Sequence, residues 1–432
     1  MILRFAALNF RSFRGRGEIS YVSTSRKDTP DWRFSSQHAP HGVLPLVGIW
    51  GANASGKTNL LAALLETRRL VRGSFTDLEP DQKVPWVPWR MTYDDQHPAG
   101  AELDIVLADD TRVHFGFRVD EQGIKEEWLY RYQGRRRQVL YHRQRAEKDP
   151  WYFGPALKGQ RHQIAEATRD NCLFLSAAAQ HNNTTLLPIF RAIVDGIRPE
   201  RRIKLKGTPL FAMNEPLLSS EFRPTLLRLL AAADLGISNV RIEEFDANIP
   251  PDAPSVEEIF RPEFLAELRR TVPAKKLTKL CFLRGASGQE AWELPPEMES
   301  RGTNVLMARL ADIVRVLQAG QLLILDEIDT SLHPDLCAEI VGLFTDPRSN
   351  PGGAQLLFST HDRSLLRAMR TDEVVLLDRD REGESHARPA SDYKGVRTRD
   401  DLRVAHEQGR IRGVPVIGDM PNALELDSSI GS

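Results

Sequence analysis

The stretch "GANASGKTN", which begins at Gly51, constrains the fold of this chain more than any other feature of the sequence. It fits the pattern G-x-x-x-x-G-K-[ST] in full and follows "LPLVGIW", a continuous apolar run typical of a buried strand. From Lys57 onward the sequence reads as a helix. A strand, a glycine-rich loop and a helix in this order form a phosphate-binding loop, because loop N–H groups turn inward at a helix start. The alternative is an ordinary glycine-rich turn.

The residues of this loop have different expected roles. Gly51 and Gly56 would let the backbone approach phosphate groups closely. Lys57 would reach the terminal phosphates, and the hydroxyl group of Thr58 would hold Mg²⁺. The complete set of nucleotide-binding candidates in the loop is Gly51, Asn53, Ser55, Gly56, Lys57, Thr58 and Asn59.

A second motif, "LLILDEIDTSLHP", supplies carboxylates at the end of an apolar strand. Ligands of α/β proteins bind at such carboxyl ends. Asp326 suits a contact with Mg²⁺, and Glu327 is placed to orient or deprotonate an attacking water. The alternative is a pair of surface carboxylates with no chemistry.

A third motif, "LLFSTHD", repeats this geometry: an apolar strand ends in Ser359, Thr360 and His361. We interpret His361 as a contact to the γ-phosphate; a purely structural histidine is the alternative. In "ESRGTNVLMARLADIV", apolar residues recur at helical spacing from Thr303 onward. Ser300, Gly302 and Thr303 would then lie at a helix N-terminus, either as a cap or as a site that an anion approaches.

The remaining pattern predicts an α/β protein. "AELDIVLAD", "TRVHFGFRV", "EEWLYRY" and "RQVLYHR" alternate like the strands of an antiparallel meander. Residues 155–300 read mostly as helices, most clearly in "RPTLLRLLAAADLGI" and "VEEIFRPEFLAELRRTV". Strand and helix patterns alternate from "QLLILDEI" to "EVVLLDR", which indicates parallel strands with crossover helices. We therefore expect three parts: an N-terminal lobe (1–154), a mainly helical insert (155–298) and a C-terminal lobe (299–432).

Composition excludes several classes of protein. The 432 residues include 58 basic and 59 acidic side chains, so no global field attracts nucleic acid or membrane. The three cysteines show neither zinc-site spacing nor a disulfide framework. No apolar run spans a bilayer, and the N-terminus lacks a signal-peptide pattern. These features lead us to expect a soluble cytoplasmic protein without a membrane partner.

Together, "GANASGKT", "ESRGT", "LLILDEIDTSLHP" and "STHD", in that order, resemble an ATP-binding-cassette ATPase. The branch is that of the structural-maintenance-of-chromosomes (SMC) proteins, RecF and the OLD nucleases, and "LNFRSFRG" looks like its first strand. "EEWLYRY", "FLSAAAQHN", "AADLGISNVRIEE" and "GRIRGVP" are similar to compact bacterial AAA family ATPases found in phage-defence and abortive-infection loci. The chain has no room for a long coiled-coil arm and ends soon after His361, so we expect no C-terminal nuclease of the OLD kind.

This resemblance implies a fold and a set of roles. The fold would be an SMC-like ATPase head, with a mixed sheet around the P-loop, an antiparallel β meander and an inserted helical region. "ESRGT" would be the signature motif, with Asp329 and Ser331 in the D-loop and His361 as the switch histidine. Gln180 is a candidate for the Q-loop glutamine, or else an ordinary surface glutamine. Ser300 and Gly302 would bind the γ-phosphate of ATP held by a second copy of the chain.

The resemblance also implies a function. We expect a Mg²⁺-dependent ATPase whose heads pair around ATP as a homodimer or higher oligomer. It would act as a sensor or regulator in antiphage defence with a separately encoded effector, such as a nuclease. A RecF-like DNA-repair clamp and a slowly hydrolysing scaffold remain as alternatives. Nucleic acid could bind at "KEEWLYRYQGRRRQVLYHRQR", where basic and aromatic residues interleave, although a solvated sheet face explains this stretch as well.

Overall fold

The computed structural model describes most of the chain. The described residues are 1–24, 33–93, 96–134, 136–200, 222–233, 235–245, 277–284, 292–294, 298–393, 396, 401–408 and 410–411. The helix expected over residues 256–272 lies outside them, as does most of "GRIRGVP". Among the described residues, no helix combines the length and the apolar character that a membrane crossing requires.

The chain divides into two compact units, each assembled from separate segments. We call them the P-loop unit, which is Ile2–Val194 with Leu357–Ser432, and the α9 unit, which is Met1 with Asp195–Leu356. The three-part division expected from the sequence, with borders at 154/155 and 298/299, stays a prediction.

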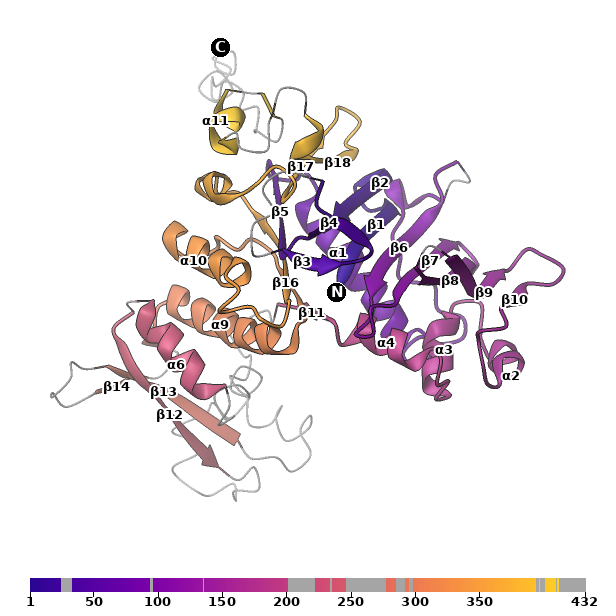
Figure 1. The fold of residues 1–432 in the computed structure, drawn as a ribbon, viewed down its shortest axis with the longest axis horizontal. Helices are drawn as coiled ribbons and strands as arrows, with labels where there is room; N and C mark the ends of the chain where they lie inside the picture. Colours follow the sequence, from indigo (N-terminus) through magenta and orange to yellow (C-terminus); the bar gives the residue numbers. More distant parts are fainter. Residues whose placement is uncertain are drawn as a thin grey trace, which may run out of the picture. The chain divides into compact units, whose positions relative to one another are not determined.

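A seven-stranded antiparallel sheet forms one layer of the P-loop unit (Figure 1). Its strands, in spatial order, are β10 (Trp151–Phe153), β9 (Arg136–Gln144), β8 (Gly123–Gln133), β7 (Arg112–Asp120), β6 (Ala99–Val106), β1 (Ile2–Phe10) and β2 (Phe13–Ser20). The expected meander is therefore confirmed as β6 to β9. The hairpin of β1 and β2 extends it, since β1 pairs with β6.

The strand before the P-loop belongs to a second, mixed sheet. Strand β5 (Leu46–Gly51) pairs in parallel with β17 (Val374–Arg379), and β17 pairs antiparallel with β18 (Ser385–Pro389). Strand β16 (Gln355–Thr360) flanks β5 on its other side. Every residue of β5 and β16 is buried, as the continuous apolar runs predict. The mixed sheet around the P-loop is confirmed.

Helix α1 (Lys57–Gly73) follows the P-loop and contacts β1, β5, α3 and α4. Its buried side carries Leu60, Leu61, Leu64 and Leu70 at helical spacing. Figure 1 shows α2, α3 and α4 grouped beside the strands β7 to β10. The other elements of this unit are β3 (Phe34–Ser36), β4 (Ala39–Val43), η1 (Trp89–Met91), α2 (Arg161–Glu166), α3 (Phe174–Gln180), α4 (Leu187–Val194), η4 (Ser364–Ala368), η5 (Ala390–Asp392) and α11 (Leu402–Glu407).

The α9 unit is built around helix α9 (Arg301–Ala319). Leu306, Leu310 and Ile313 are buried on α9, Ser300 caps its start, and Gly320 ends it in the left-handed region at φ 63°. The parallel pair of β11 (Ile197–Pro199) and β15 (Leu322–Leu325) belongs to the same unit, as does α10 (Pro334–Thr345). The expected strand–helix order in this part of the chain is confirmed.

The inserted region contains strands as well as helices. The expected helices are present as α2, α3, α4 and α6 (Arg223–Ala232). Strands β12 (Ile237–Phe245), β13 (Leu277–Arg284) and β14 (Trp292–Leu294) form an antiparallel sheet that the sequence analysis did not predict. Gly236, at φ 66°, separates α6 from β12, so the helix pattern of "RPTLLRLLAAADLGI" ends earlier than expected.

Candidate functional site

Two glycines shape the P-loop by both space and conformation. A Cβ atom on Gly51 would lie 2.5 Å from Ser55 Oγ and 2.6 Å from the carbonyl oxygen of Leu377. Gly56 has φ 105°, and a Cβ there would lie 2.5 Å from Ser385 Oγ. Ala54 is also left-handed, at φ 60°. Alternation of right- and left-handed residues turns successive N–H groups inward, which is the backbone of an anion-binding nest.

The ammonium group of Lys57 lies inside this loop. Its Nζ donates hydrogen bonds to the carbonyl oxygens of Gly51, at 2.8 Å, and Ala52, at 3.0 Å. The same Nζ lies 3.5 Å from Nδ1 of His361, which follows β16. The structure thus brings the predicted P-loop lysine and the predicted switch histidine together. Lys57 is 6% exposed, so the loop buries its cation rather than leaving it in solvent.

The other loop candidates differ in their surroundings. Asn53 and Thr58 are exposed. Asn59 donates from Nδ2 to Ser12 Oγ at 2.8 Å, so it ties the start of α1 to the turn between β1 and β2. Ser55 is buried, and its Oγ has no hydrogen-bond partner among the described residues. A buried hydroxyl without a partner is costly, and a phosphate oxygen in the loop would satisfy it. The residues present therefore fit a nucleotide.

The two candidate carboxylates lie on a tight turn that follows β15. Asp326 is half-buried and Glu327 is exposed. Glu327 adopts φ 51°, a left-handed conformation that costs a non-glycine residue about 1–2 kcal/mol. Thr330 donates from its backbone N to the carbonyl oxygen of Glu327 at 2.9 Å and from Oγ1 to its carboxylate at 3.1 Å. These contacts fix both the backbone and the carboxylate of Glu327.

The start of α9 is capped as its sequence predicts. Ser300 Oγ accepts a hydrogen bond from the backbone N of Thr303 at 3.0 Å and lies 2.8 Å from Thr303 Oγ1. A Cβ atom on Gly302 would lie 2.7 Å from the carbonyl oxygen of Ser331. Gly302 is therefore required by a close approach within the chain. The anion approach expected at this glycine stays a prediction, as do the D-loop roles of Asp329 and Ser331.

A half-buried ion pair holds Glu299, the residue before this cap. Arg284 of β13 donates from Nε and Nη2 to the two carboxylate oxygens of Glu299, at 2.7 and 2.9 Å. Burial raises the pKa of Glu299, but the Arg284 guanidinium outweighs this effect, so the pKa of this carboxyl lies below its ordinary value. Sequence analysis did not identify Arg284, because nothing local to "ESRGT" indicates a partner in a distant strand.

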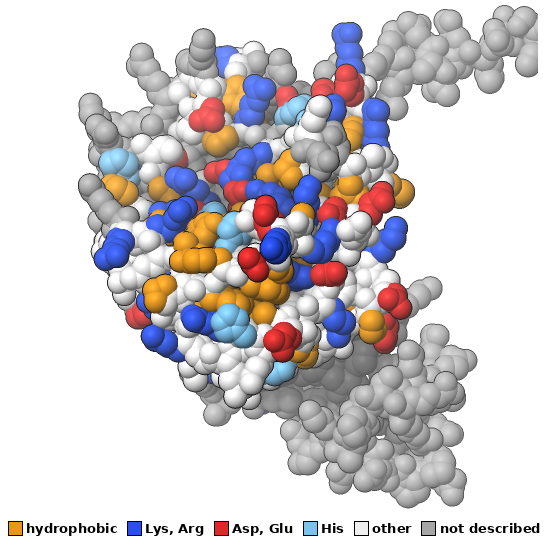
Figure 2. Space-filling model, turned by 90° about the vertical axis from the view of Figure 1, so that its right-hand side faces the viewer, with side chains coloured by type: hydrophobic (Ala, Val, Ile, Leu, Met, Phe, Trp, Pro, Cys, Tyr) orange, Lys and Arg blue, Asp and Glu red, His pale blue; other side chains and the backbone are white. Residues whose placement is uncertain are grey.

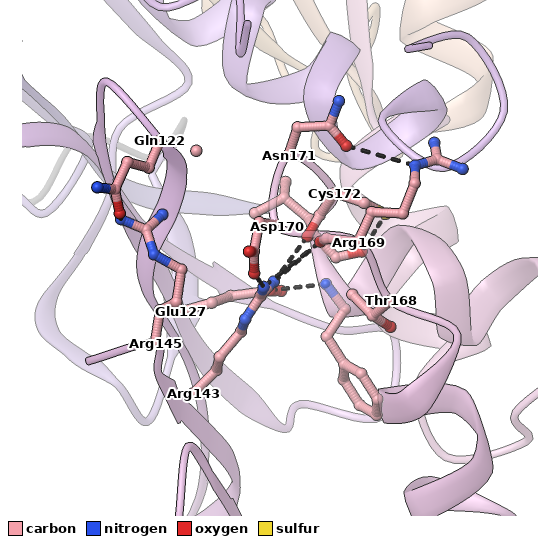
Figure 3. Close-up of polar contacts among 12 residues, drawn as sticks. Gln122, Glu127, Arg143, Arg145, Thr168, Arg169, Asp170, Asn171 and Cys172 are labelled. Atoms are coloured by element: carbon pink, nitrogen blue, oxygen red, sulfur yellow. Dashed lines mark hydrogen bonds and ion pairs between the residues drawn. The ribbon is translucent and has the colours of Figure 1, made fainter. Parts of the chain in front are cut away.

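Gln180, the Q-loop candidate, is exposed and is the last residue of α3. The start of α3 is held by Glu127, a fully buried residue of β8 that sequence analysis also missed (Figure 3). Its carboxylate accepts hydrogen bonds from Tyr141 Oη at 2.6 Å and from the backbone N of Phe174 and Leu175 at 2.7 and 3.1 Å. The sequence signal that could have identified Glu127 is an acidic residue on the core-facing side of "EEWLYRY".

Arg143 of β9 lies beside Glu127 and holds the loop before α3. It donates to the carbonyl oxygen of Cys172 and to Asp170 Oδ1, both at 2.9 Å, and its side chain is 3% exposed (Figure 3). Since Glu127 and Arg143 face each other across β8 and β9, one register pair fixes where α3 begins. The role of Gln180 itself stays a prediction.

Trp128 and Tyr130 of the aromatic and basic stretch lie on the face of β8 opposite Glu127. Arg118 lies over Trp128 at 4.7 Å from the ring centroid, and Arg137 lies over Tyr130 at 4.8 Å. Arg118 is also paired with Glu102. These contacts are typical of a polar sheet face whose arginines are paired with aromatic and acidic side chains of the same face. Figure 2, which views the side where β7 to β10 lie in Figure 1, shows basic side chains interspersed with acidic and apolar ones.

The predicted site residues fall into two groups. The first, in the P-loop unit, contains Gly51, Asn53, Ser55, Gly56, Lys57, Thr58, Asn59, Gln180 and His361. The second, in the α9 unit, contains Ser300, Gly302, Thr303, Asp326, Glu327, Asp329 and Ser331. Within each group the structure gives the local geometry described above. Joint action of the groups on one nucleotide, including a shared Mg²⁺ between Thr58 and Asp326, stays a prediction.

Comparison with known proteins identifies one family. Residues 46–367, which include both groups, match the family described as "AAA domain, putative AbiEii toxin, Type IV TA system". No curated protein matches the chain.

Among solved structures, the chain is similar to SMC head domains. The SMC head domain from Thermotoga maritima has 12% sequence identity and a TM-score of 0.39, with 90% of this chain and 98% of that chain covered. An SMC head with an extended coiled coil from Pyrococcus furiosus, bound to the C-terminal domain of ScpA, has 12% identity and a TM-score of 0.37, with 94% and 99% covered. These scores are low, and the architecture rests on the strands and helices described above.

Proposed function

Because the chain belongs to the family described as "AAA domain, putative AbiEii toxin, Type IV TA system", we propose that it binds ATP with Mg²⁺ and hydrolyses it to ADP and phosphate. The observation that carries this proposal is the P-loop itself. A left-handed Ala54 and Gly56, the buried ammonium of Lys57 and the start of α1 together form a site for a polyphosphate.

Each residue has a role that follows from its chemistry. Lys57 exchanges its loop carbonyls for terminal phosphate oxygens, and Ser55 Oγ gains the partner that it lacks among the described residues. Thr58 and Asp326 would hold Mg²⁺, whose charge would neutralise the phosphates. Glu327 accepts the proton of the attacking water, and His361 contacts the γ-phosphate from beside Lys57.

We further propose that two heads pair around ATP. Ser300, Gly302 and Thr303 would face the γ-phosphate held by the partner, with Asp329 and Ser331 at the same interface. The well-formed cap at Ser300 supports a rigid helix start at this place. In the cell the paired heads would act as a sensor or regulator in antiphage defence with a separate effector, and the terms "AbiEii toxin" and "TA system" of the family description support this setting.

This function is favoured over a DNA clamp for a specific reason. Arg118 of β7 and Arg137 of β9 already lie over Trp128 and Tyr130 of the aromatic stretch, and Arg118 is paired with an acidic side chain. Stacking of bases on these rings would first have to displace the arginines.

Loss of the P-loop cation tests the proposal. Lys57→Ala should weaken ATP binding at least about tenfold, because a charge-assisted contact to phosphate is lost. Lys83→Ala is the matched control, since Lys83 is exposed; its ATP affinity should equal that of the wild type. ATP affinity by calorimetry and the melting temperature of both variants are measured together. Wild-type ATP affinity in a folded Lys57→Ala protein would contradict the proposal that this loop binds the nucleotide.

A further inference from the structure

Arg309, in the middle of α9, is a buried arginine whose hydrogen bonds meet on the Glu327 turn. Its Nη2 donates to the carbonyl oxygen of Glu327 at 3.1 Å, and its Nη1 donates to the carbonyl oxygen of the next residue, Ile328. The Arg309 side chain is 3% exposed. Two consecutive carbonyl groups on one guanidinium fix the two peptide groups that follow Glu327 and Ile328, because the fork of donors is planar.

The first of these peptide groups adjoins the strained residue of the turn. Glu327 is left-handed at φ 51°, a conformation that persists in a non-glycine residue only when its surroundings enforce it. Thr330 and Arg309 both donate to the carbonyl oxygen of Glu327. The Glu327 side chain leaves the backbone at this residue, so whatever fixes the backbone also aims the carboxylate.

A carboxylate orients the guanidinium in turn. Arg309 Nε donates to Glu200 Oε1 at 2.8 Å, and the backbone N of Glu200 donates to the carbonyl oxygen of Ile324 in β15 at 3.0 Å. Burial raises the pKa of Glu200, and the Arg309 charge opposes that rise. Glu200 therefore connects Arg309 to the strand that leads into the turn.

The same helix touches the turn at a second point. Gly302, in the first turn of α9, lies against the carbonyl oxygen of Ser331, so closely that a Cβ would be 2.7 Å away. Ser331 is also left-handed, at φ 64°. Both left-handed residues of the turn are thus contacted by α9, one through Gly302 and one through Arg309.

We infer that Arg309 is a positioning residue for hydrolysis, through which helix α9 sets the direction of the Glu327 carboxylate in its own chain. The inference rests on the proposed role of Glu327 as the base. Lysine cannot replace Arg309, because a single ammonium does not offer the planar fork that spans two carbonyls and a carboxylate.

Steady-state ATPase kinetics of Arg309→Lys test this inference. We expect kcat to fall at least about tenfold while KM stays within about threefold, because a misdirected base slows chemistry without removing phosphate contacts. Arg315→Lys, the same replacement on the same helix, is the control and should keep both parameters. An Arg309→Lys enzyme with wild-type kcat would overturn the inference.

A double variant separates positioning from general structural damage. If Arg309 acts through Glu327, then Arg309→Lys should cause no further loss of kcat in a Glu327→Gln background. Independent, multiplicative losses in the double variant would contradict this route. Should Arg309→Lys fail to fold, Glu200→Gln replaces it, because it keeps Arg309 and removes only the charge that orients it. Its kcat should fall severalfold at unchanged KM, and an unchanged kcat would equally overturn the inference.

The outcomes distinguish the two proposals. A slow Glu327→Gln enzyme beside a normal Arg309→Lys enzyme would leave the proposed function intact and refute positioning by Arg309. Normal hydrolysis by Glu327→Gln would instead refute the role of Glu327 on which both depend.

Discussion

Glu127 combines a fully buried carboxyl group with three hydrogen-bond donors, so its protonation is coupled to the stability of the P-loop unit. Burial raises the pKa of this carboxyl above its ordinary value of 4.5, and the donors and the nearby Arg143 only partly oppose the rise. A raised pKa means that the folded state binds the proton more tightly than the unfolded state. The stability that this proton contributes is complete below pH 4.5 and is lost as pH rises through the pKa of the folded state.

Glu127→Gln should expose this dependence. The amide presents an N–H₂ group to donors that the carboxylate satisfied, so we expect a loss of about 1–3 kcal/mol of unfolding free energy. The loss should be largest near pH 4 and should shrink as pH rises, because only the wild type gives up a proton. Thermal unfolding of both proteins across this range measures the difference. A difference that does not change with pH would contradict the raised pKa.

Among the secondary-structure elements, residue patterns within one segment predicted the helices and strands whose formation depends on that segment alone. The alternation in "TRVHFGFRV" and "EEWLYRY" predicted β7 and β8, and the apolar spacing after Thr303 predicted α9 and its cap. Strands β12 to β14 were missed because "ISNVRIEEF" follows a strong helix pattern, and its partner in β13 is distant in sequence. Pairing between distant strands is a tertiary effect, which no local window contains.

The residues of the candidate site show the same difference between local motifs and contacts with other segments. The P-loop residues could be predicted because one contiguous motif holds them all. Arg309, Arg284 and Glu127 could not, since each contacts another element, 18, 15 and 47 residues away in the chain. Gly302 shows how a residue can have a second structural reason: the approach of an anion stays a prediction, and the glycine also lies against the carbonyl oxygen of Ser331.

At the scale of the whole molecule, pairing of two heads can be tested by mixing variants. Ser300→Asp keeps a residue that caps helices well and adds a negative charge that would repel a partner's γ-phosphate. Alone it should bind ATP but hydrolyse it poorly. Mixed with Lys57→Ala, it should recover up to about a quarter of wild-type activity, because half of the random pairs contain one intact composite site.

The control mixture combines Lys57→Ala with Glu327→Gln. Both residues would serve the same chain's nucleotide, so no mixed pair has an intact site and no activity should return. ATPase rates are measured on mixtures in which mixed pairs have been demonstrated. Absence of recovery in the Ser300→Asp mixture would leave Ser300 as a helix cap alone.

In the proposed mechanism, ATP held by the P-loop is hydrolysed through Glu327. Single-turnover hydrolysis of ATP by Glu327→Gln, beside ATP affinity measured on the same preparation, tests it most directly. We expect an ATP affinity within a fewfold of the wild type and hydrolysis slower by at least about a hundredfold, as the loss of a general base requires. Hydrolysis at the wild-type rate would contradict it, because another group would then deprotonate the water.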